Sequence, residues 1–421
     1  MIKFLHTADL HLGKSFHEYS LIEDQAYMLN ELSGLLADPS CNALVISGDV
    51  FDRSIPSPEA VELFSGFLGK LKASRPDLEI LIIPGNHDSP VRLGYGKELF
   101  SGLGIHIAGE AEQAFKPVIV RAGKESCACF LLPFLYPGSL VPASGTGAES
   151  VGEENLQEKT SVPSVPPEET PANPAVPLRE MPAYRGQAAL AEEAAKRLET
   201  ARQKALAEGA SSSLLAAHLF CSGGKSSDSE RTFLGQAEQA DPGLFSGFDY
   251  VALGHLHRPQ KVGKNAWYPG SPLAYSFDEA DHQKCFLSVE IAGDSGGCAV
   301  KTLHFSPRRP LRRLSGPFEN FLKDQDASLK EAENCFLEIT LSGGSLTENA
   351  LPILRRRFPF LLSVRQDEAR AAMTAEEPVR KTGSRNILDD FGEFLEEIYG
   401  KADGEKLRCF AEILQNLKEE T

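Results

Sequence analysis

The sequence lacks the features that define several large classes of protein. Its eight cysteines are scattered along 421 residues and include no CxxC pair, so we expect neither a disulfide framework nor a cysteine-based zinc site. No apolar run approaches the roughly 18 residues that a membrane helix requires. The amino terminus has neither the basic start nor the long apolar segment of a secretory signal. We therefore expect a cytoplasmic protein with reduced thiols and no membrane association.

Positive charge is also scarce. The chain has 43 Lys and Arg residues against 59 Asp and Glu residues, which gives a formal net charge of -16. A protein that coats nucleic acid by bulk electrostatics needs the opposite balance, because it neutralises phosphates with Lys and Arg. Any contact with DNA must therefore be local or supplied by a partner. The chain contains no GxxxxGK[ST] motif, so it carries no P-loop ATPase site of its own.

Short apolar runs alternate with helical patterns in the first hundred residues. The runs at residues 2–5, 43–46 and 79–84 have the composition of buried strands, and the stretches at 21–36 and 57–71 have helical periodicity. This order predicts an α/β fold with a parallel sheet. Such sheets place their chemistry at the carboxyl ends of the strands.

Side chains that bind metals follow nearly every predicted strand. Each of them alone is more often a turn former or a structural histidine. In the DLH and HLH motifs the outer residues are two positions apart, so in extended backbone each pair points to one side. The repetition at strand ends favours one shared site. No functional assignment is made for His6, His17, His106, His282 and His304. The seven candidate ligands are Asp9, His11, Asp49, Asn86, His218, His255 and His257.

This set of oxygen and nitrogen donors without a thiolate favours two divalent ions such as manganese, iron or zinc. Two ions roughly 3.5–4 Å apart need a shared ligand. A carboxylate can bridge two ions where an imidazole cannot, so we expect Asp49 to be the bridge. Such a pair of ions activates a water molecule and holds the oxygens of a phosphate.

The motifs DLH, GDVFD, GNHD, a lone histidine after a strand, and GHLH occur in this order between residues 9 and 257. In this order they resemble the calcineurin-like metallophosphoesterases, whose fold has two facing mixed β-sheets flanked by helices. The longer stretches HTADLHLGK, SGDVFDRSIPSPEA, PGNHDS and YVALGHLHRPQ are similar to the bacterial DNA nucleases of that superfamily. The resemblance implies one Mn2+ on Asp9, His11, Asp49 and His257, and a second on Asp49, Asn86, His218 and His255.

The same resemblance implies that His87 is a catalytic acid and not a metal ligand. His87 would protonate or orient the leaving oxygen of a phosphodiester, with Asp88 holding its ring. The archaeal members of the group carry a second active-site histidine where this chain has Asp52, so Asp52 receives no catalytic role.

The rest of the chain suggests three domains. Residues 1–310 would form the catalytic domain, with a Pro-rich insertion at 138–182 that we expect to be disordered. Strands at 285–291 and 300–305 would complete the second sheet. The basic stretch at 307–313 is either a solvated linker or a phosphate contact.

Residues 311–372 would form a small α+β capping domain whose Arg355–Arg357 cluster could meet a phosphate backbone. Residues 385–421 would form two amphipathic helices that either pack on each other or bind a partner.

Together, these observations and the resemblance lead us to expect an Mn-dependent DNA nuclease that acts on duplex ends and hairpins. By resemblance, its partners are DNA and a coiled-coil ATPase subunit, in a heterotetramer that contains two copies of this chain. The enzyme alternative is a phosphatase or cyclic-nucleotide phosphodiesterase with the same two-metal site. The non-enzyme alternative is a scaffold that uses the fold for assembly only.

Overall fold

The computed structural model describes residues 1–140, 186–230, 239–293, 297–323, 327–342 and 349–366, together with residues 391, 404, 406–408, 410 and 411. The predicted insertion at 138–182 and the predicted tail at 385–421 therefore lie almost wholly outside the described residues. The chain divides into two compact units, Met1–Gln366 and Asp367–Thr421. Among the helices of the described part, none is long and apolar enough to cross a lipid bilayer.

A six-stranded mixed sheet contains the predicted parallel strands. Its order is β14 (Cys298–His304), β13 (Cys285–Ile291), β1 (Ile2–Thr7), β4 (Ala43–Ser47), β5 (Glu79–Ile83) and β6 (Ile105–Ile107). Strands β1, β4 and β5 are parallel, as predicted, and β6 continues the parallel order. The prediction that strands at 285–291 and 300–305 complete the second sheet is wrong. Strand β13 instead pairs antiparallel with β1 and covers its free edge in the first sheet.

A second six-stranded mixed sheet faces the first. Its order is β11 (Gln260–Val262), β12 (Ala266–Tyr268), β10 (Tyr250–Gly254), β9 (Ser212–His218), β8 (Glu125–Leu132) and β7 (Val118–Ala122). Strands β8, β9, β10 and β12 are parallel, and the two edge strands are antiparallel to their neighbours. The fold class predicted from the sequence, two mixed sheets with flanking helices, is confirmed.

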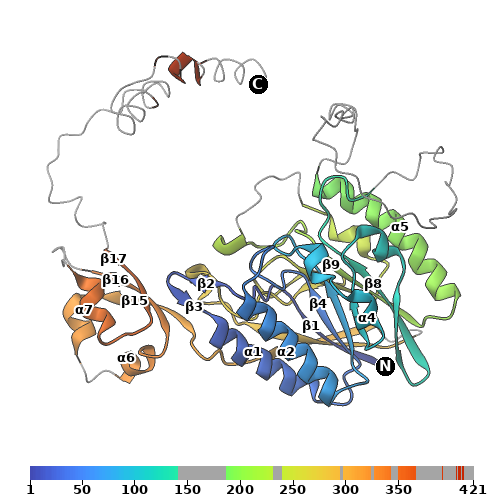
Figure 1. The fold of residues 1–421 in the computed structure, drawn as a ribbon, viewed down its shortest axis with the longest axis horizontal. Coiled ribbons are helices and arrows are strands. Elements are labelled where there is room, and N and C mark those ends of the chain that lie inside the picture. Colours follow the sequence, from blue (N-terminus) through green and yellow to red (C-terminus); the bar gives the residue numbers. More distant parts are fainter. Residues whose placement is uncertain are drawn as a thin grey trace, which may run out of the picture. The chain divides into compact units, whose positions relative to one another are not determined.

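The layers follow from which side chains are buried. One apolar cluster fills the space between the sheets and includes Phe4, Val45 and Leu214. Helices α1 (Ile22–Leu36) and α2 (Pro58–Ser74) pack on the outer face of the first sheet, and α5 (Gln187–Ala207) packs on the outer face of the second (Figure 1). The side chain of Ser57 accepts a hydrogen bond from the backbone N–H of Ala60, which defines the start of α2.

Short elements connect these layers. They are the β2 (Ser15–Phe16) and β3 (Tyr19–Ser20) hairpin and the helices α3 (Pro90–Leu93) and α4 (Lys97–Ser101). We call residues 1–310 the large lobe and residues 311–366 the small lobe.

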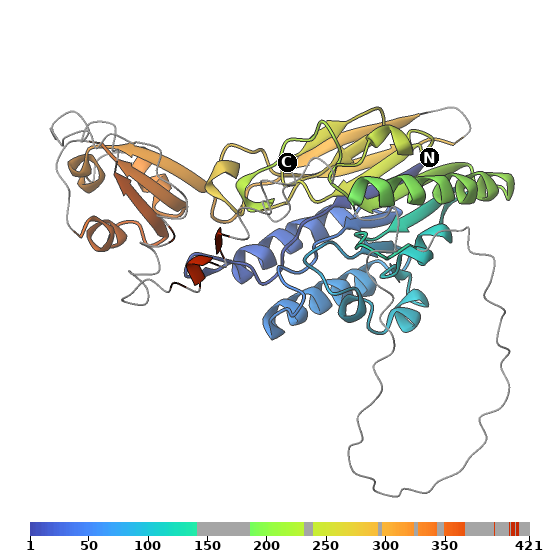
Figure 2. The same cartoon turned by 90° about the horizontal axis from the view of Figure 1, so that it is seen from above.

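The small lobe has its own parallel sheet and its own core (Figure 2). The sheet has the order β15 (Leu311–Gly316), β16 (Phe336–Leu341) and β17 (Leu361–Gln366), with helices α6 (Ala327–Ala332) and α7 (Ala350–Arg355) beside it. The Tyr19 hydroxyl of the large lobe donates to the Pro359 carbonyl, 2.5 Å away, so the lobes are in direct contact.

The basic stretch at 307–313 is not a solvated linker. Its second half enters strand β15, and Arg309 binds back to α1, where its Nη1 lies 2.6 Å from Asp24 Oδ2. The Arg309 guanidinium also lies 4.5 Å from the centroid of the Phe360 ring in the small lobe, so Arg309 connects the two lobes.

The prediction that the Arg355–Arg357 cluster meets a phosphate backbone is also not supported for two of its three members. Arg355 Nε donates to the carbonyl of Leu361, and Arg357 Nη1 donates to the carbonyl of Phe321 at 2.9 Å. Both side chains serve the fold of the small lobe.

Candidate metal centre

The candidate ligands lie at or just after the carboxyl ends of five strands. Three of these strands belong to the first sheet and two to the second. Strands β1, β4 and β5 of the first sheet end at Thr7, Ser47 and Ile83, shortly before the DLH, GD and GNH motifs. In the second sheet, β9 ends on His218 itself, and β10 ends at Gly254, just before the HLH motif. The two edges meet closely, because a Cβ added to Gly254 would lie 1.8 Å from the Ser47 carbonyl oxygen.

The backbone at these positions is strained. Four of the seven candidates are non-glycine residues with positive φ, namely Asp9 (54°), His11 (43°), Asp49 (48°) and His255 (109°). Such conformations cluster at functional sites, where the surroundings impose them. The predicted extended geometry of the DLH and HLH motifs is therefore wrong. Their side chains converge because the chain has already left the strand in a left-handed turn.

The first group of donors is Asp9, His11 and His257. Their donor atoms all lie within 4.8 Å of one another, and the three side chains are buried. Nε2 of His11 and Nε2 of His257 are 3.1 Å apart. Two imidazoles bound to one ion at about 2.0–2.1 Å each would have this separation.

The second group surrounds Asn86. Its side-chain oxygen lies 3.1 Å from His218 Nε2 and 3.1 Å from His255 Nδ1. The three side chains come from different strands of both sheets and offer three neutral donors to one point.

Asp49 lies between the two groups. Its Oδ2 is 3.8 Å from His11 Nε2 and 3.6 Å from His218 Nε2, while its Oδ1 accepts a hydrogen bond from the backbone N–H of His87. The Asp49 side chain can lie here because residue 85 is a glycine. A Cβ on residue 85 would lie 2.1 Å from Asp49 Oδ1. Among the candidates, Asp49 is the residue whose geometry suits a bridge.

Burial favours the neutral form of three of the imidazoles, and it leaves two buried carboxylates that a cation would compensate. Burial lowers the pKa of His218 to about 3 and, with help from neighbouring imidazoles, lowers the pKa values of His11 and His255 well below their usual range. Burial raises the pKa of Asp49, and burial together with the charge of Asp49 raises that of Asp9. Neutral imidazoles are the form that binds metals, and a divalent cation would compensate both buried carboxylates. The residues present thus fit a pair of divalent ions.

Hydrogen bonds behind the imidazoles orient them. The Nδ1 of His218 donates to the Ser47 carbonyl at 2.9 Å, which leaves Nε2 for the centre. Behind His257, the Ser229 hydroxyl lies 2.8 Å from Nδ1, and Glu279 Oε1 lies 3.3 Å from it. Partners of this kind fix the tautomer and direction of a ligating histidine.

A buried lysine supports this arrangement. Lys284 Nζ donates to the His257 carbonyl at 2.9 Å and lies 2.5 Å from Glu279 Oε2. Although burial opposes it, the charge of Lys284 together with His257 holds the pKa of Glu279 well below its usual range. Neither residue stands in a recognisable motif, so no sequence signal pointed to them.

His87 lies beside the first group without joining it through a hydrogen bond. Its ring centroid is 4.8 Å from that of His11, and its Nδ1 lies 2.9 Å from the backbone carbonyl of Asp52. With Nδ1 donating to that carbonyl, Nε2 is the nitrogen available to a substrate.

Asp88 does not hold the His87 ring, so that prediction is wrong. Its carboxylate accepts hydrogen bonds from the backbone N–H groups of Val50, Phe51 and Gly85, at 2.9–3.0 Å. Asp88 therefore ties the loop after β4 to the loop after β5, a structural role.

Replacing Asp88 by alanine is expected to destabilise the fold by roughly 3 kcal/mol or more, because three buried N–H groups would lose their acceptor. Denaturant unfolding would measure the loss. Glu62→Ala, which removes an exposed carboxylate of α2, is the matched control. If the variant kept its stability but lost catalysis, Asp88 would have a direct role in catalysis.

Asp52 also lies close to the candidate metal ligands. Its Oδ1 accepts a hydrogen bond from Lys14 Nζ at 2.7 Å and lies 3.6 Å from Nδ1 of His11. The donor atoms of His11, Asp52 and His87 also lie within 4.8 Å of one another. The sequence indicated no role here, because the residue differs from the one the resemblance called for.

The chain is similar to known proteins in its first third and over most of its length. The model of the calcineurin-like phosphoesterase family matches residues 2–138. Two relatives are named as the SbcD subunit of the nuclease SbcCD. That of Staphylococcus epidermidis is 27% identical over 407 residues, and that of Staphylococcus saprophyticus is 27% identical over 398 residues. Each alignment covers 93% of this chain and 92% of the relative.

Among solved structures, the protein TT1561 of Thermus thermophilus matches 64% of this chain and 89% of its own, with 13% sequence identity and a TM-score of 0.32. The family match at 2–138 contains the motifs up to GNHD. His218, His255 and His257 lie beyond that range and are joined to the centre by the contacts described above.

Proposed function

Because the chain carries a calcineurin-like metallophosphoesterase domain and is a metal-dependent hydrolase, we propose that it is an Mn-dependent DNA nuclease. It would degrade duplex ends as an exonuclease and open hairpins as an endonuclease. The observation that carries the proposal is the pair of donor groups on either side of Asp49, with the His87 ring beside them. The name of the relatives, which are nuclease components, supports DNA as the substrate.

In this proposal one ion is held by Asp9, His11, Asp49 and His257, and the other by Asp49, Asn86, His218 and His255. When bound, the two ions neutralise the charge of the phosphodiester and lower the pKa of the attacking water. The protein orients its imidazoles through Ser47, Ser229 and Glu279. Water would add to phosphorus as the P–O bond to the leaving group breaks, and the water would lose one proton to solvent. The proton on His87 Nε2 would pass to the leaving oxygen, and His87 would take up a proton again from solvent.

The test is incubation of the purified chain with Mn2+ and a hairpin-ended duplex. Cleavage that requires Mn2+ and is lost with a chelator is the expected result. Hydrolysis of phosphomonoesters or cyclic nucleotides without any DNA cleavage would favour the small-molecule phosphatase or phosphodiesterase. Binding without hydrolysis of any of these would favour a scaffold.

We further propose that two copies of the chain associate. Five large apolar side chains lie exposed on or near α3 and α4, namely Ile55, Val91, Tyr95, Leu99 and Leu103, with exposed fractions between 59% and 85%. The loop that carries Ile55 contacts α3, because Arg92 Nη1 donates to the Ser54 carbonyl. Apolar patches of this kind usually mark protein interfaces.

Leu99→Glu is expected to convert a dimer into a monomer, because a charge would be buried in the interface. Light scattering during size exclusion should then give the 45.7 kDa mass of one chain in place of twice that mass. Ile119→Glu, on edge strand β7 of the second sheet, is the control and should leave the mass unchanged. A wild-type chain that is already monomeric at micromolar concentration would contradict the proposal.

The relatives' name also supports an SbcC-type ATPase as the partner. We propose a heterotetramer that contains two copies of this chain. We propose residues 385–421 as its binding segment, residues 311–372 as a capping domain and residues 1–310 as the catalytic domain. Phe391 and Phe410 stack with ring centroids 4.2 Å apart, so the two segments of the tail contact each other. The described cysteines Cys41 to Cys335 are free thiols, which supports action in the reducing cytoplasm.

Deleting residues 387–421 is expected to abolish binding to the ATPase while basal cleavage of small phosphodiesters continues, because the segment supplies no candidate ligand. Co-purification of the two chains measures the first effect, and hydrolysis of an aryl phosphodiester measures the second. Undiminished co-purification of the truncated chain would refute the assignment.

A further inference from the structure

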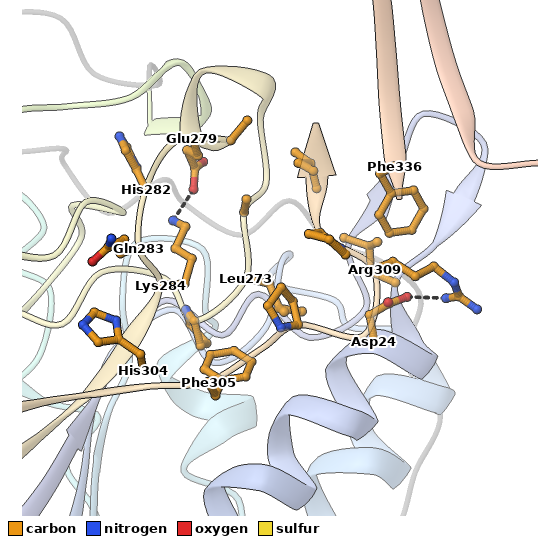
Figure 3. Close-up of a pocket in the computed structure, with 17 residues that line it drawn as sticks. Asp24, Leu273, Glu279, His282, Gln283, Lys284, His304, Phe305, Arg309 and Phe336 are labelled. Carbon is orange, nitrogen blue, oxygen red and sulfur yellow. Dashed lines mark hydrogen bonds and ion pairs between the residues drawn. The ribbon is translucent and has the colours of Figure 1, made fainter. Parts of the chain in front are cut away.

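The two imidazoles of the first donor group differ in what lies behind them. Behind His257, Glu279 Oε1 lies 3.3 Å from Nδ1. Lys284 Nζ lies 2.5 Å from the second oxygen of that carboxylate, the contact drawn between Glu279 and Lys284 in Figure 3. A carboxylate of this kind fixes the direction of a ligating histidine and makes it a better ligand. The other imidazole, His11, has no hydrogen bond behind it.

The ring of His11 has a proton without an acceptor. Its Nε2 lies 3.1 Å from His257 Nε2, on the side of the first donor group. When Nε2 of a neutral imidazole binds an ion, the proton is on Nδ1. In His11 this Nδ1 is buried and has no hydrogen-bond partner among the described residues. A buried N–H group without an acceptor is costly, so an acceptor is expected close by.

Asp52 places a carboxylate beside this atom. Its Oδ1 lies 3.6 Å from His11 Nδ1, just beyond hydrogen-bond range. The same oxygen accepts a hydrogen bond from Lys14 Nζ at 2.7 Å. The arrangement of imidazole, carboxylate and lysine behind His257 is therefore repeated behind His11, with a longer distance between imidazole and carboxylate.

The backbone fixes the position of Asp52. Its N–H donates to the Leu12 carbonyl at 3.1 Å, and Leu12 forms a parallel bridge with Phe51. The loop after β4 thus runs beside the loop after β1, which carries His11. The contact between Asp52 and the His87 ring is made by the backbone carbonyl, so it does not depend on the Asp52 side chain.

We propose that Asp52 is a positioning residue for His11, whose Nδ1 proton its carboxylate accepts once an ion is bound at Nε2. The proposal rests on the proposed function, in which His11 is a ligand of the first ion. A cation bound at one nitrogen withdraws electron density from the ring, which makes the N–H at the other nitrogen a stronger donor. The carboxylate in turn raises the affinity of the imidazole for the ion, and Lys14 holds the carboxylate in place.

Asp52→Asn tests the proposal, because it removes the charge and keeps the size of the side chain and the backbone carbonyl. The measurement is titration calorimetry of the full-length, metal-free chain with Mn2+. The wild type should bind two ions. In the variant one ion should bind roughly ten- to a hundredfold more weakly, the loss that removal of such a partner commonly causes. The other ion should keep its affinity, because its imidazoles do not contact Asp52.

Melting curves of the metal-free chain separate this role from a structural one. Asp52→Asn should melt at the temperature of the wild type, because an amide oxygen can still accept the hydrogen bond from Lys14. The stabilisation by a limiting concentration of Mn2+ should be smaller in the variant. Glu62→Gln, which makes the same chemical change at an exposed carboxylate of α2, is the control and should change neither result.

The proposal is overturned if Asp52→Asn binds both ions as tightly as the wild type, or weakens both equally. It is also overturned if the metal-free variant melts at a clearly lower temperature, since the role would then be structural. A third ion in the wild type that the variant lacks would make Asp52 a ligand instead. If the wild-type chain binds no Mn2+, the proposed metal centre itself fails, and this proposal fails with it.

Discussion

Replacing Asp49 by alanine is expected to remove both metal ions at once. Its Oδ2 lies within 3.8 Å of one imidazole from each donor group, so the two groups share this single carboxylate. Without it, each ion would keep only the ligands of its own side, and one group would have no carboxylate at all. Hydrolysis should fall by more than the ~10²–10³-fold that loss of one electrostatic group commonly costs.

Metal analysis and melting curves test this expectation independently of activity. Mn2+ should raise the melting temperature of the wild type, because ligands that bind the native state stabilise it. It should not change the melting temperature of the variant. Glu62→Ala, which removes an exposed carboxylate of α2, is the control and should behave as the wild type. If the variant kept close to two ions per chain, Asp49 would not be the bridging ligand.

Replacing His87 by alanine is expected to leave the metal content unchanged while DNA cleavage falls by ~10²–10⁴-fold. The ring lies beside His11, and its Nδ1 hydrogen bond goes to the backbone carbonyl of Asp52 and not to a carboxylate of the centre. An imidazole can carry and release a proton near neutral pH. The alkoxide that leaves a DNA strand needs such a proton far more than a nitrophenolate does.

The discriminating measurement compares two substrates in the same variant. Cleavage of DNA should suffer strongly, and hydrolysis of an activated aryl phosphodiester should suffer much less. His17→Ala removes an exposed histidine outside the centre and should change neither rate. If His87→Ala loses an ion, His87 is a ligand, and the proposed second site must be redrawn.

Much of the fold was fixed by local pattern. The apolar runs at 2–5, 43–46 and 79–84 became parallel strands because continuous apolar segments must be buried on both faces. The helices at 22–36 and 58–74 followed from one-sided apolar periodicity. The order of the motifs placed seven donors at strand ends, and the sheet brought them to one edge.

Tertiary structure decided what local pattern cannot encode, namely which distant segments meet. Strand β13 has the composition of a strand in either sheet, and only its register against β1 assigned it to the first. Asp88 follows His87 in sequence, yet it binds backbone N–H groups of the neighbouring loop, because a left-handed turn at Asp49 presents them.

The residues that orient the candidate ligands also could not be predicted from the sequence. Glu279 reaches His257 across 22 positions, and the Asp52 carbonyl reaches His87 across 35. Asp24 and Arg309 form a hydrogen bond across 285 positions. In the sequence each is an ordinary surface-type charged or polar residue. The sequence therefore determined the strands and the donor set, whereas burial and long-range contact determined which side chains orient the donors, because hydrogen-bond partners are chosen in three dimensions.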